Sequence, residues 1–132
     1  MDVISGQIHV LCDVVYTILP HVRAGRVRAL GVTSLKRSPI APEVLTFDEA
    51  GIPGYEMTNW MGYAFPARTP RDLVLRLNAE INRVLLSPSM MKAIVERGSI
   101  PIGGTPEQFA EHISKETEKW GRVIKAAGIK PQ

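Results

Sequence analysis

The sequence of 132 residues predicts an α/β fold. Two observations lead to this prediction. Near the start, two short apolar runs rich in β-branched residues flank a helical pattern, which is the order of a βαβ unit. The second half of the chain repeats helix-start signals followed by apolar residues at helical spacing. The chain therefore combines strands and helices within the size of one domain or two small lobes.

The predicted βαβ unit comes first. Its strands are Gln7–Asp13 and Val27–Thr33, and both are mostly apolar. Between them, Val14–Ala24 places apolar side chains at positions i, i+3, i+4 and i+7, which gives a helix one apolar face. Gly25 is a helix stop signal. Two strands joined by a helix lie parallel, so a parallel sheet is expected.

A long loop is predicted next, because residues 34–55 are rich in Pro and Gly. Within it, only Thr46–Ala50 has the pattern of a short helical turn. Glu56–Phe65 then alternates and contains several aromatic residues, as a strand does, and Pro66 ends it. Loops of this length often connect lobes or border binding sites.

Three helices are predicted after the loop, each opened by a hydroxyl residue followed by proline. They start at Thr69-Pro70, Ser87-Pro88 and Thr105-Pro106, and Ser99–Ile102 is a short strand candidate. The turn Gly103-Gly104-Thr105 can also be read as a cradle for an anion at a helix N-terminus. Helix capping accounts for all of its residues, so capping is the favoured interpretation.

Composition and charge exclude several classes of protein. Apolar residues make up 45% and charged residues 22% of the chain, so disorder is not expected. The net charge is only +3, and the basic residues are mixed with acidic ones, so nucleic acid is not an expected partner. Among the basic residues, Arg23, Arg26 and Arg28 form a group that can meet an anion. Their place beside a helix end favours compensation of the helix dipole instead.

The residues offer only a weak catalytic pattern and make a metal site improbable, and the family resemblance described below implies that the chain is not an enzyme and holds no metal or cofactor. Cys12 is the single cysteine, and the histidines are His9, His21 and His112. His9 and Cys12 are three apart on a predicted strand, so they face opposite sides. Cys12 is therefore expected to be a small buried residue.

Asp13 is the main candidate for a binding residue. It ends a predicted buried strand just before a helix, where open α/β sheets place ligand contacts. Its carboxylate can accept hydrogen bonds from an amine, a hydroxyl or a water. Capping of the following helix is an equally good reading of the local pattern. Thr17, one turn later, faces either the same crevice or the helix surface.

Several motifs carry a resemblance to a known family. They are G-Q-I-H-V-L-C-D, L-P-H-V-R-A-G-R-V-R-A-L-G-V-T-S-L-K-R-S-P, P-E-V-L-T-F-D-E-A-G-I-P-G-Y-E, W-M-G-Y-A-F-P-A-R-T-P, L-N-A-E-I-N-R-V-L, G-G-T-P-E-Q-F and W-G-R-V-I-K-A-A-G-I-K. In this order they resemble the substrate-binding proteins of tripartite tricarboxylate transporters, also called Bug proteins. The resemblance covers the chain from about Asp2 onward.

The resemblance implies a type II periplasmic-binding-protein fold, here truncated and with parts of both lobes. Residues 1–56 would then belong to the second ligand-binding lobe. Residues 57–132 would form the hinge strand and the C-terminal helical part of the first lobe. The implied function is to capture a small organic carboxylate or an acidic amino acid in the periplasm and deliver it to membrane transporter subunits.

The family's ligand contacts carry over to few positions. Its strand-end aspartate matches Asp13, and a small hydroxyl residue after it matches Thr17. Tyr16 lies within a stretch that departs from the usual Asn-Leu-Pro-like pattern, and Arg68 replaces the glycine of the usual A-P-A-G-T-P segment. Both changes add bulk near the expected hinge or cleft.

The family's chains are more than twice as long, which leads to an alternative function. Without the missing strands, sheet edges and apolar faces are exposed, so the chain is expected to self-associate as a homodimer or to be marginally stable. The alternative is a truncated remnant that folds by self-association and binds no ligand. Residues 1–6 lack the pattern of a secretory signal, so the periplasmic assignment comes from the family alone.

Overall fold

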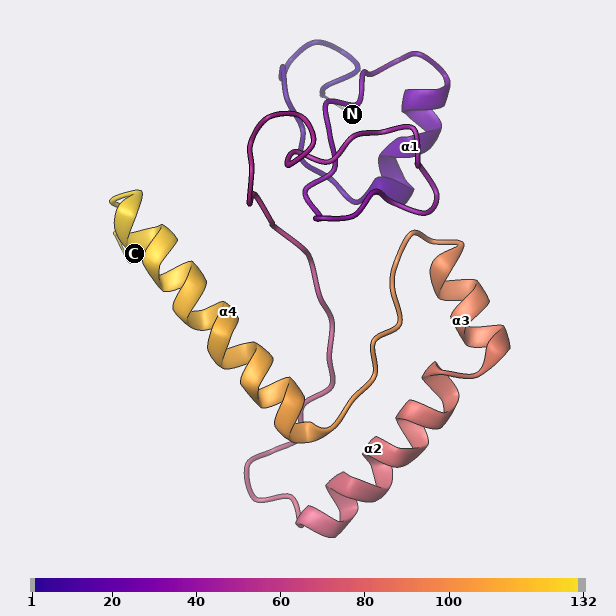
Figure 1. The fold of residues 1–132 in the computed structure, drawn as a ribbon, viewed down its shortest axis with the longest axis vertical. Helices are drawn as coiled ribbons and strands as arrows, with labels where there is room; N and C mark the ends of the chain where they lie inside the picture. Colours follow the sequence, from indigo (N-terminus) through magenta and orange to yellow (C-terminus); the bar gives the residue numbers. More distant parts are fainter. Residues whose placement is uncertain (1, 131–132) are drawn as a thin grey trace. The chain divides into compact units, whose positions relative to one another are not determined.

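The computed structural model describes residues 2–130, in which the second and third of four helices follow each other closely and the others are connected by long irregular segments (Figure 1). In chain order the four helices are α1 (Val15–Arg23), α2 (Arg71–Leu85), α3 (Pro88–Val95) and α4 (Pro106–Ala126). All four confirm helices predicted from the sequence. No helix of these residues combines the length and the apolar character needed to cross a membrane.

Local signals set the ends of the helices. Thr105 forms a capping box with Gln108: its hydroxyl oxygen accepts from the Gln108 N–H at 3.2 Å, and the Gln108 side chain accepts from the Thr105 N–H at 2.8 Å. Gly25 follows α1 and Gly98 follows α3 with φ of 67° and 74°. Glycine adopts this conformation without a steric cost, so both helices end where the sequence predicts.

The predicted strands do not form within residues 2–130. The one strand-like contact there is an isolated parallel bridge between Val32 and Thr46. Beside it, Met57 donates to the Thr33 carbonyl at 2.9 Å. The prediction of paired strands at residues 7–13, 27–33, 56–65 and 99–102 is therefore wrong for this part of the chain. A helix completes its hydrogen bonds within itself, but a strand needs a neighbouring strand.

The chain divides into two compact units. The first consists of Met1–Trp60 together with Pro88–Pro101, and the second of Met61–Ser87 together with Ile102–Gln132. The helix α3 therefore belongs to the first unit, with α1 and the long loop. The helices α2 and α4 belong to the second. The assignment of residues 1–56 to one ligand-binding lobe and of residues 57–132 to the hinge strand and the other lobe stays a prediction.

The first unit holds all the buried residues of the described chain. They are Leu19, Val32, Ser38, Ala41 and Thr46. Arg23, at the end of α1, donates to the Ile40 carbonyl at 3.0 Å and so ties the helix to the loop. The turn after α3 packs on the same loop, because a Cβ added to Gly98 would lie 2.8 Å from a methyl carbon of Ile40.

The second unit is held by contacts between α2 and the segment that leads into α4. Asn82 accepts from the Gly104 N–H and donates to the Gly104 carbonyl, both at 2.9 Å, and Asn78 donates to the same carbonyl at 2.9 Å. Arg71 pairs with Glu107 at the starts of the two helices. Neither helix has a buried residue.

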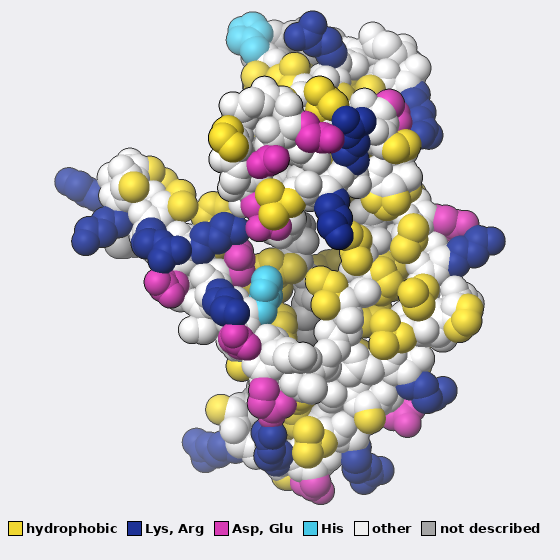
Figure 2. Space-filling model, in the orientation of Figure 1, with side chains coloured by type: hydrophobic (Ala, Val, Ile, Leu, Met, Phe, Trp, Pro, Cys, Tyr) yellow, Lys and Arg dark blue, Asp and Glu magenta, His cyan; other side chains and the backbone are white. Residues whose placement is uncertain are grey.

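Large apolar side chains remain open to solvent in both units. Exposed fractions reach 93% at Met61, 82% at Ile102, 75% at Tyr63 and 70% at Val10. Figure 2 shows many apolar side chains open on the face that it presents. Single exposed apolar residues are ordinary, but here they far outnumber the buried ones.

Candidate functional site

Asp13 lies two residues before α1, and its side chain is exposed. Its carboxylate oxygen Oδ1 accepts from the Val14 N–H at 2.7 Å. The N-cap position belongs to Val14, which has an extended backbone and no side-chain cap. The structure therefore does not show Asp13 as the N-cap of α1.

Thr17 lies in the first turn of α1, and it is also exposed. Its hydroxyl donates to the Val14 carbonyl at 2.6 Å, and its backbone N–H donates to the same carbonyl at 3.0 Å. Asp13 and Thr17 thus both bond to the backbone of Val14. The structure brings the two predicted site residues together at the N-terminus of α1.

This arrangement combines an acceptor with a positive helix end. The first N–H groups of a helix have no partner within it, and the N-terminus has a partial positive charge. The Asp13 carboxylate has acceptor capacity beyond the one bond to Val14. Tyr16 in the same turn is 54% exposed, so its ring is open beside this end of the helix.

The Gly103-Gly104-Thr105 turn has a structural role, as the capping interpretation predicts. The Gly104 N–H donates to the Asn82 side chain, and the Thr105 N–H donates to Gln108. These donors are used within the protein and do not face outward to an anion. Capping of α4 is confirmed.

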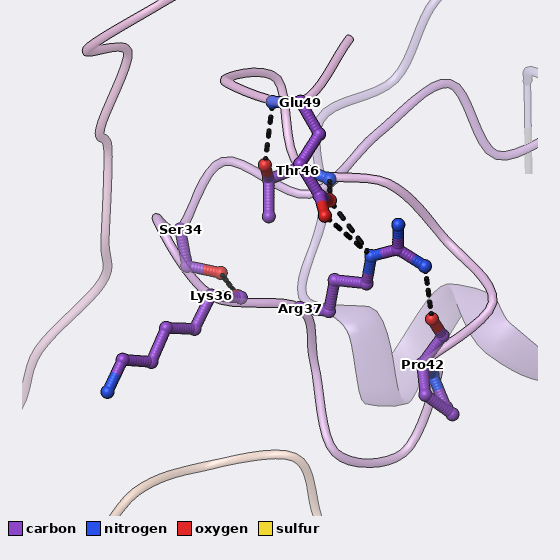
Figure 3. Close-up of polar contacts among 6 residues, drawn as sticks. All are labelled: Ser34, Lys36, Arg37, Pro42, Thr46 and Glu49. Carbon is purple, nitrogen blue, oxygen red and sulfur yellow. Dashed lines mark hydrogen bonds and ion pairs between the residues drawn. The ribbon is translucent and has the colours of Figure 1, made fainter.

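A network that the sequence analysis missed holds the long loop (Figure 3). The Arg37 guanidinium Nε donates to both carboxylate oxygens of Glu49 at 3.0 and 2.9 Å, and Nη1 donates to the Pro42 carbonyl at 3.0 Å. Glu49 also accepts from the Thr46 N–H at 2.9 Å, and the Thr46 hydroxyl accepts from the Glu49 N–H at 3.0 Å. Thr46 and Glu49 have the spacing of a capping box, which is the signal that could have revealed this network.

The network shifts the ionisation of both charged partners. The hydrogen bond from Arg37 is the main cause that lowers the pKa of Glu49, and the Thr46 N–H adds to it. The same bond with Glu49 raises the pKa of Arg37. The printed bonds of Arg37, Thr46 and Glu49 all go to other parts of the same loop, so the network fixes the loop.

Cys12 is exposed, so the prediction that it is buried is wrong. Burial of that residue depended on a strand with neighbours on both faces, and these neighbours are not among residues 2–130. No cluster of three or more His, Cys, Asp or Glu side chains suited to a metal ion is found in that part of the chain.

Arg68, the second departure from the family pattern, lies in a turn of the second unit. The Thr69 N–H donates to the Pro66 carbonyl at 3.0 Å and closes this turn. The Arg68 side chain is exposed. The structure therefore places Arg68 and Asp13 in different units.

Comparison with known proteins identifies the family. The sequence model of the family described as tripartite tricarboxylate transporter family receptor matches residues 1–129. The chain belongs to this family. The resemblance on which the sequence analysis relied is confirmed.

Relatives from several bacteria support the assignment. A UPF0065 protein from the tcbD-tcbE intergenic region of a Pseudomonas species is 44% identical over 93% of this chain. Protein BugT of Bordetella pertussis is 30% identical over 98% of it. The chain spans 37% and 40% of the length of these two proteins.

Solved structures show the fold. The R. palustris protein Rpa4515, described with adipate, is 36% identical and has a TM-score of 0.87 over 99% of this chain and 44% of its own. MatC from Rhodopseudomonas palustris, with bound malate, is 30% identical and has a TM-score of 0.75 over 93% and 43%. The chain therefore has the fold of part of a periplasmic binding protein, as predicted.

Proposed function

We propose that this chain takes part in capturing a small organic carboxylate, or an acidic amino acid, for a tripartite tricarboxylate-type uptake transporter in the periplasm. The observation that carries the proposal is the family match over residues 1–129. The adipate and malate of the two similar structures support carboxylates as the ligand class. Capture is binding without chemical change, so the role proposed is not enzymatic.

The residues proposed to contact the ligand are Asp13 and Thr17. An anionic ligand is attracted by the positive end of α1 but repelled by the Asp13 carboxylate. The ligand therefore presents a donor to Asp13, which is its own hydroxyl or amine or a water that it holds. Thr17 contributes a hydroxyl on the same turn. In this proposal residues 1–56 belong to one lobe, and residues 57–132 supply the hinge strand and part of the other.

Calorimetric titration of the chain with malate, adipate and glutamate tests the proposal. Asp13→Ala removes a charged acceptor, and we expect affinity to fall about tenfold or more. Thr17→Val removes one neutral hydroxyl and is expected to cost about fivefold. Glu43→Ala is the matched control, because Glu43 is an exposed carboxylate of the same unit and lies outside α1 and the residues that lead into it. Equal loss in the control variant, or no binding of any of the three ligands, contradicts the proposal.

An alternative function is self-association of a folded remnant that has no affinity for ligand. The exposed apolar side chains favour it, since a second copy can cover them. Sedimentation equilibrium of the chain alone measures this directly. A concentration-dependent homodimer with an unchanged melting temperature in every carboxylate supports the alternative. A monomer whose melting temperature rises with one of the ligands contradicts it.

A further inference from the structure

The hydrogen bond that Thr17 makes at the start of α1 fixes what this residue can offer to a ligand. Its hydroxyl oxygen lies 2.6 Å from the Val14 carbonyl oxygen. A carbonyl oxygen only accepts, so the single hydroxyl proton of Thr17 is used in this bond. The Thr17 oxygen has only its lone pairs left. Thr17 therefore meets a ligand as an acceptor.

Asp13 has the same polarity. Its oxygen Oδ1 accepts from the Val14 N–H at 2.7 Å, and Oδ2 makes no hydrogen bond within residues 2–130. An ionised carboxylate has no proton to donate, so both oxygens act only as acceptors. The two side chains proposed to contact the ligand thus offer acceptors, and neither offers a donor.

A carboxylate is a poor group to place against these two side chains. It also only accepts, and its charge has the same sign as that of Asp13. A hydroxyl or an ammonium group supplies the proton that the oxygens of Asp13 and Thr17 require. A bond from either group to the Asp13 carboxylate is charge-assisted, and such bonds are about twice as strong as those between neutral groups.

A bridging water keeps this polarity. A water that donates to both Asp13 and Thr17 uses its two protons in these bonds, and only its lone pairs then face the ligand. A ligand carboxylate cannot bind to those lone pairs, whereas a hydroxyl or an ammonium group donates to them. The part of the ligand that faces this turn is therefore a donor with the water or without it.

We propose that the ligand has a hydroxyl or an ammonium group in addition to its carboxylates, and that this donor group is the part that contacts Asp13 and Thr17. The inference rests on the proposed function, because it takes binding of a small carboxylate at this turn as given. It narrows the ligand class to hydroxy- and amino-dicarboxylates. A plain dicarboxylate of the same length lacks the donor, and other groups hold the carboxylates of the ligand.

Calorimetric titration of the chain with two matched pairs of ligands tests the inference. Malate and succinate differ only in one hydroxyl, and glutamate and glutarate only in one ammonium group. We expect the ligand with the donor to bind about tenfold or more tightly in each pair. Equal affinities within both pairs overturn the inference but leave the proposed function standing, because carboxylates still bind. No binding of any of the four ligands overturns both.

The variant Asp13→Asn reverses the polarity of one group. Its amide oxygen can still accept from the Val14 N–H, and its NH₂ group places a donor where Oδ2 was. We expect the preference for malate over succinate to disappear or to reverse. Glu43→Gln makes the same chemical change at an exposed position of the same unit outside the site, and it should keep the preference. A wild-type preference in Asp13→Asn overturns the inference.

Thr17 gives a second, smaller test. Thr17→Val removes the acceptor and should weaken malate more than succinate, whereas Thr17→Ser keeps the hydroxyl and should keep the preference. Both ligands of a pair are measured on the same variant, so a loss of folded protein changes both titrations alike and leaves the ratio of affinities intact. Equal weakening of malate and succinate by Thr17→Val contradicts a contact between Thr17 and the donor group.

Discussion

The unit with less regular secondary structure is the one that has the buried residues. The first unit is mostly loop, yet it holds every buried residue of the described chain. The second consists mainly of α2 and α4, and none of its described residues is buried. Helices form from local hydrogen bonds and caps, but their stability in proteins comes mostly from packing. Regular structure and a core are thus separate properties, and each unit shows one of them.

The largest expected effect contrasts the same substitution in the two units. Leu19→Ala in the first unit removes a side chain that is 6% exposed, and should destabilise it by about 2–5 kcal/mol. Leu73→Ala in α2 removes one that is 42% exposed, and should cost about 1 kcal/mol or less. Chemical denaturation followed by amide exchange in each unit measures both. Similar losses in the two units would show that burial does not distinguish them.

Two glycines of the second unit, Gly62 and Gly121, differ in how closely other atoms pack around them. A Cβ added to Gly62 would overlap the Phe109 ring, so Gly62→Ala should cost about 1–3 kcal/mol by overpacking. The same change at Gly121, inside α4, meets no atom within 4 Å and should stabilise the helix by about 0.5–1 kcal/mol. Thermal melts followed by circular dichroism give both values. A Gly62→Ala variant as stable as the wild type would mean that this segment does not pack on α4.

The smallest expected effect is the pH dependence of the loop network in the first unit. The hydrogen bond from Arg37 lowers the pKa of Glu49 from its ordinary 4.5. The stabilisation is therefore complete above the pKa of the unfolded carboxyl and is lost as pH falls through the lower, folded pKa. We expect the Thr46 amide, which donates to Glu49, to lose protection below that range, with its exchange rate compared to the intrinsic rate at each pH. Glu49→Gln should abolish this pH dependence, whereas Glu43→Gln, outside the network, should preserve it.

The helices were predictable because their signals are local. Proline after a hydroxyl residue and glycine at positive φ place the ends of α3 and α4 within the chain itself. The strands were not predicted correctly, because a strand needs a neighbouring strand, and residues 7–13 and 61–65 have no paired strand within residues 2–130. The exposure of Cys12 has the same cause. Burial is a property of the whole packed fold, and a residue type predicts it only on average.

The candidate site was predictable in part. The strand-to-helix junction and the family pattern selected Asp13 and Thr17, and the structure places both on the backbone of Val14. Their role toward a ligand stays a prediction. The Arg37–Glu49 contact was missed because it joins residues twelve apart across an irregular loop, where no periodic pattern exists. The capping-box spacing of Thr46 and Glu49 was its only local sign.

The Asn82 side chain works as a substitute peptide group. Its amide accepts from the Gly104 N–H and donates to the Gly104 carbonyl, which are the two hydrogen bonds that a residue of an adjacent strand would form with Gly104. Conversion of Asn82 to aspartate keeps the shape but turns the donor into a second acceptor, which then faces the carbonyls of Gly104 and Asn78. The side-chain amides of Asn78 and Asn82 both donate to the Gly104 carbonyl and so together hold α2 to the turn into α4.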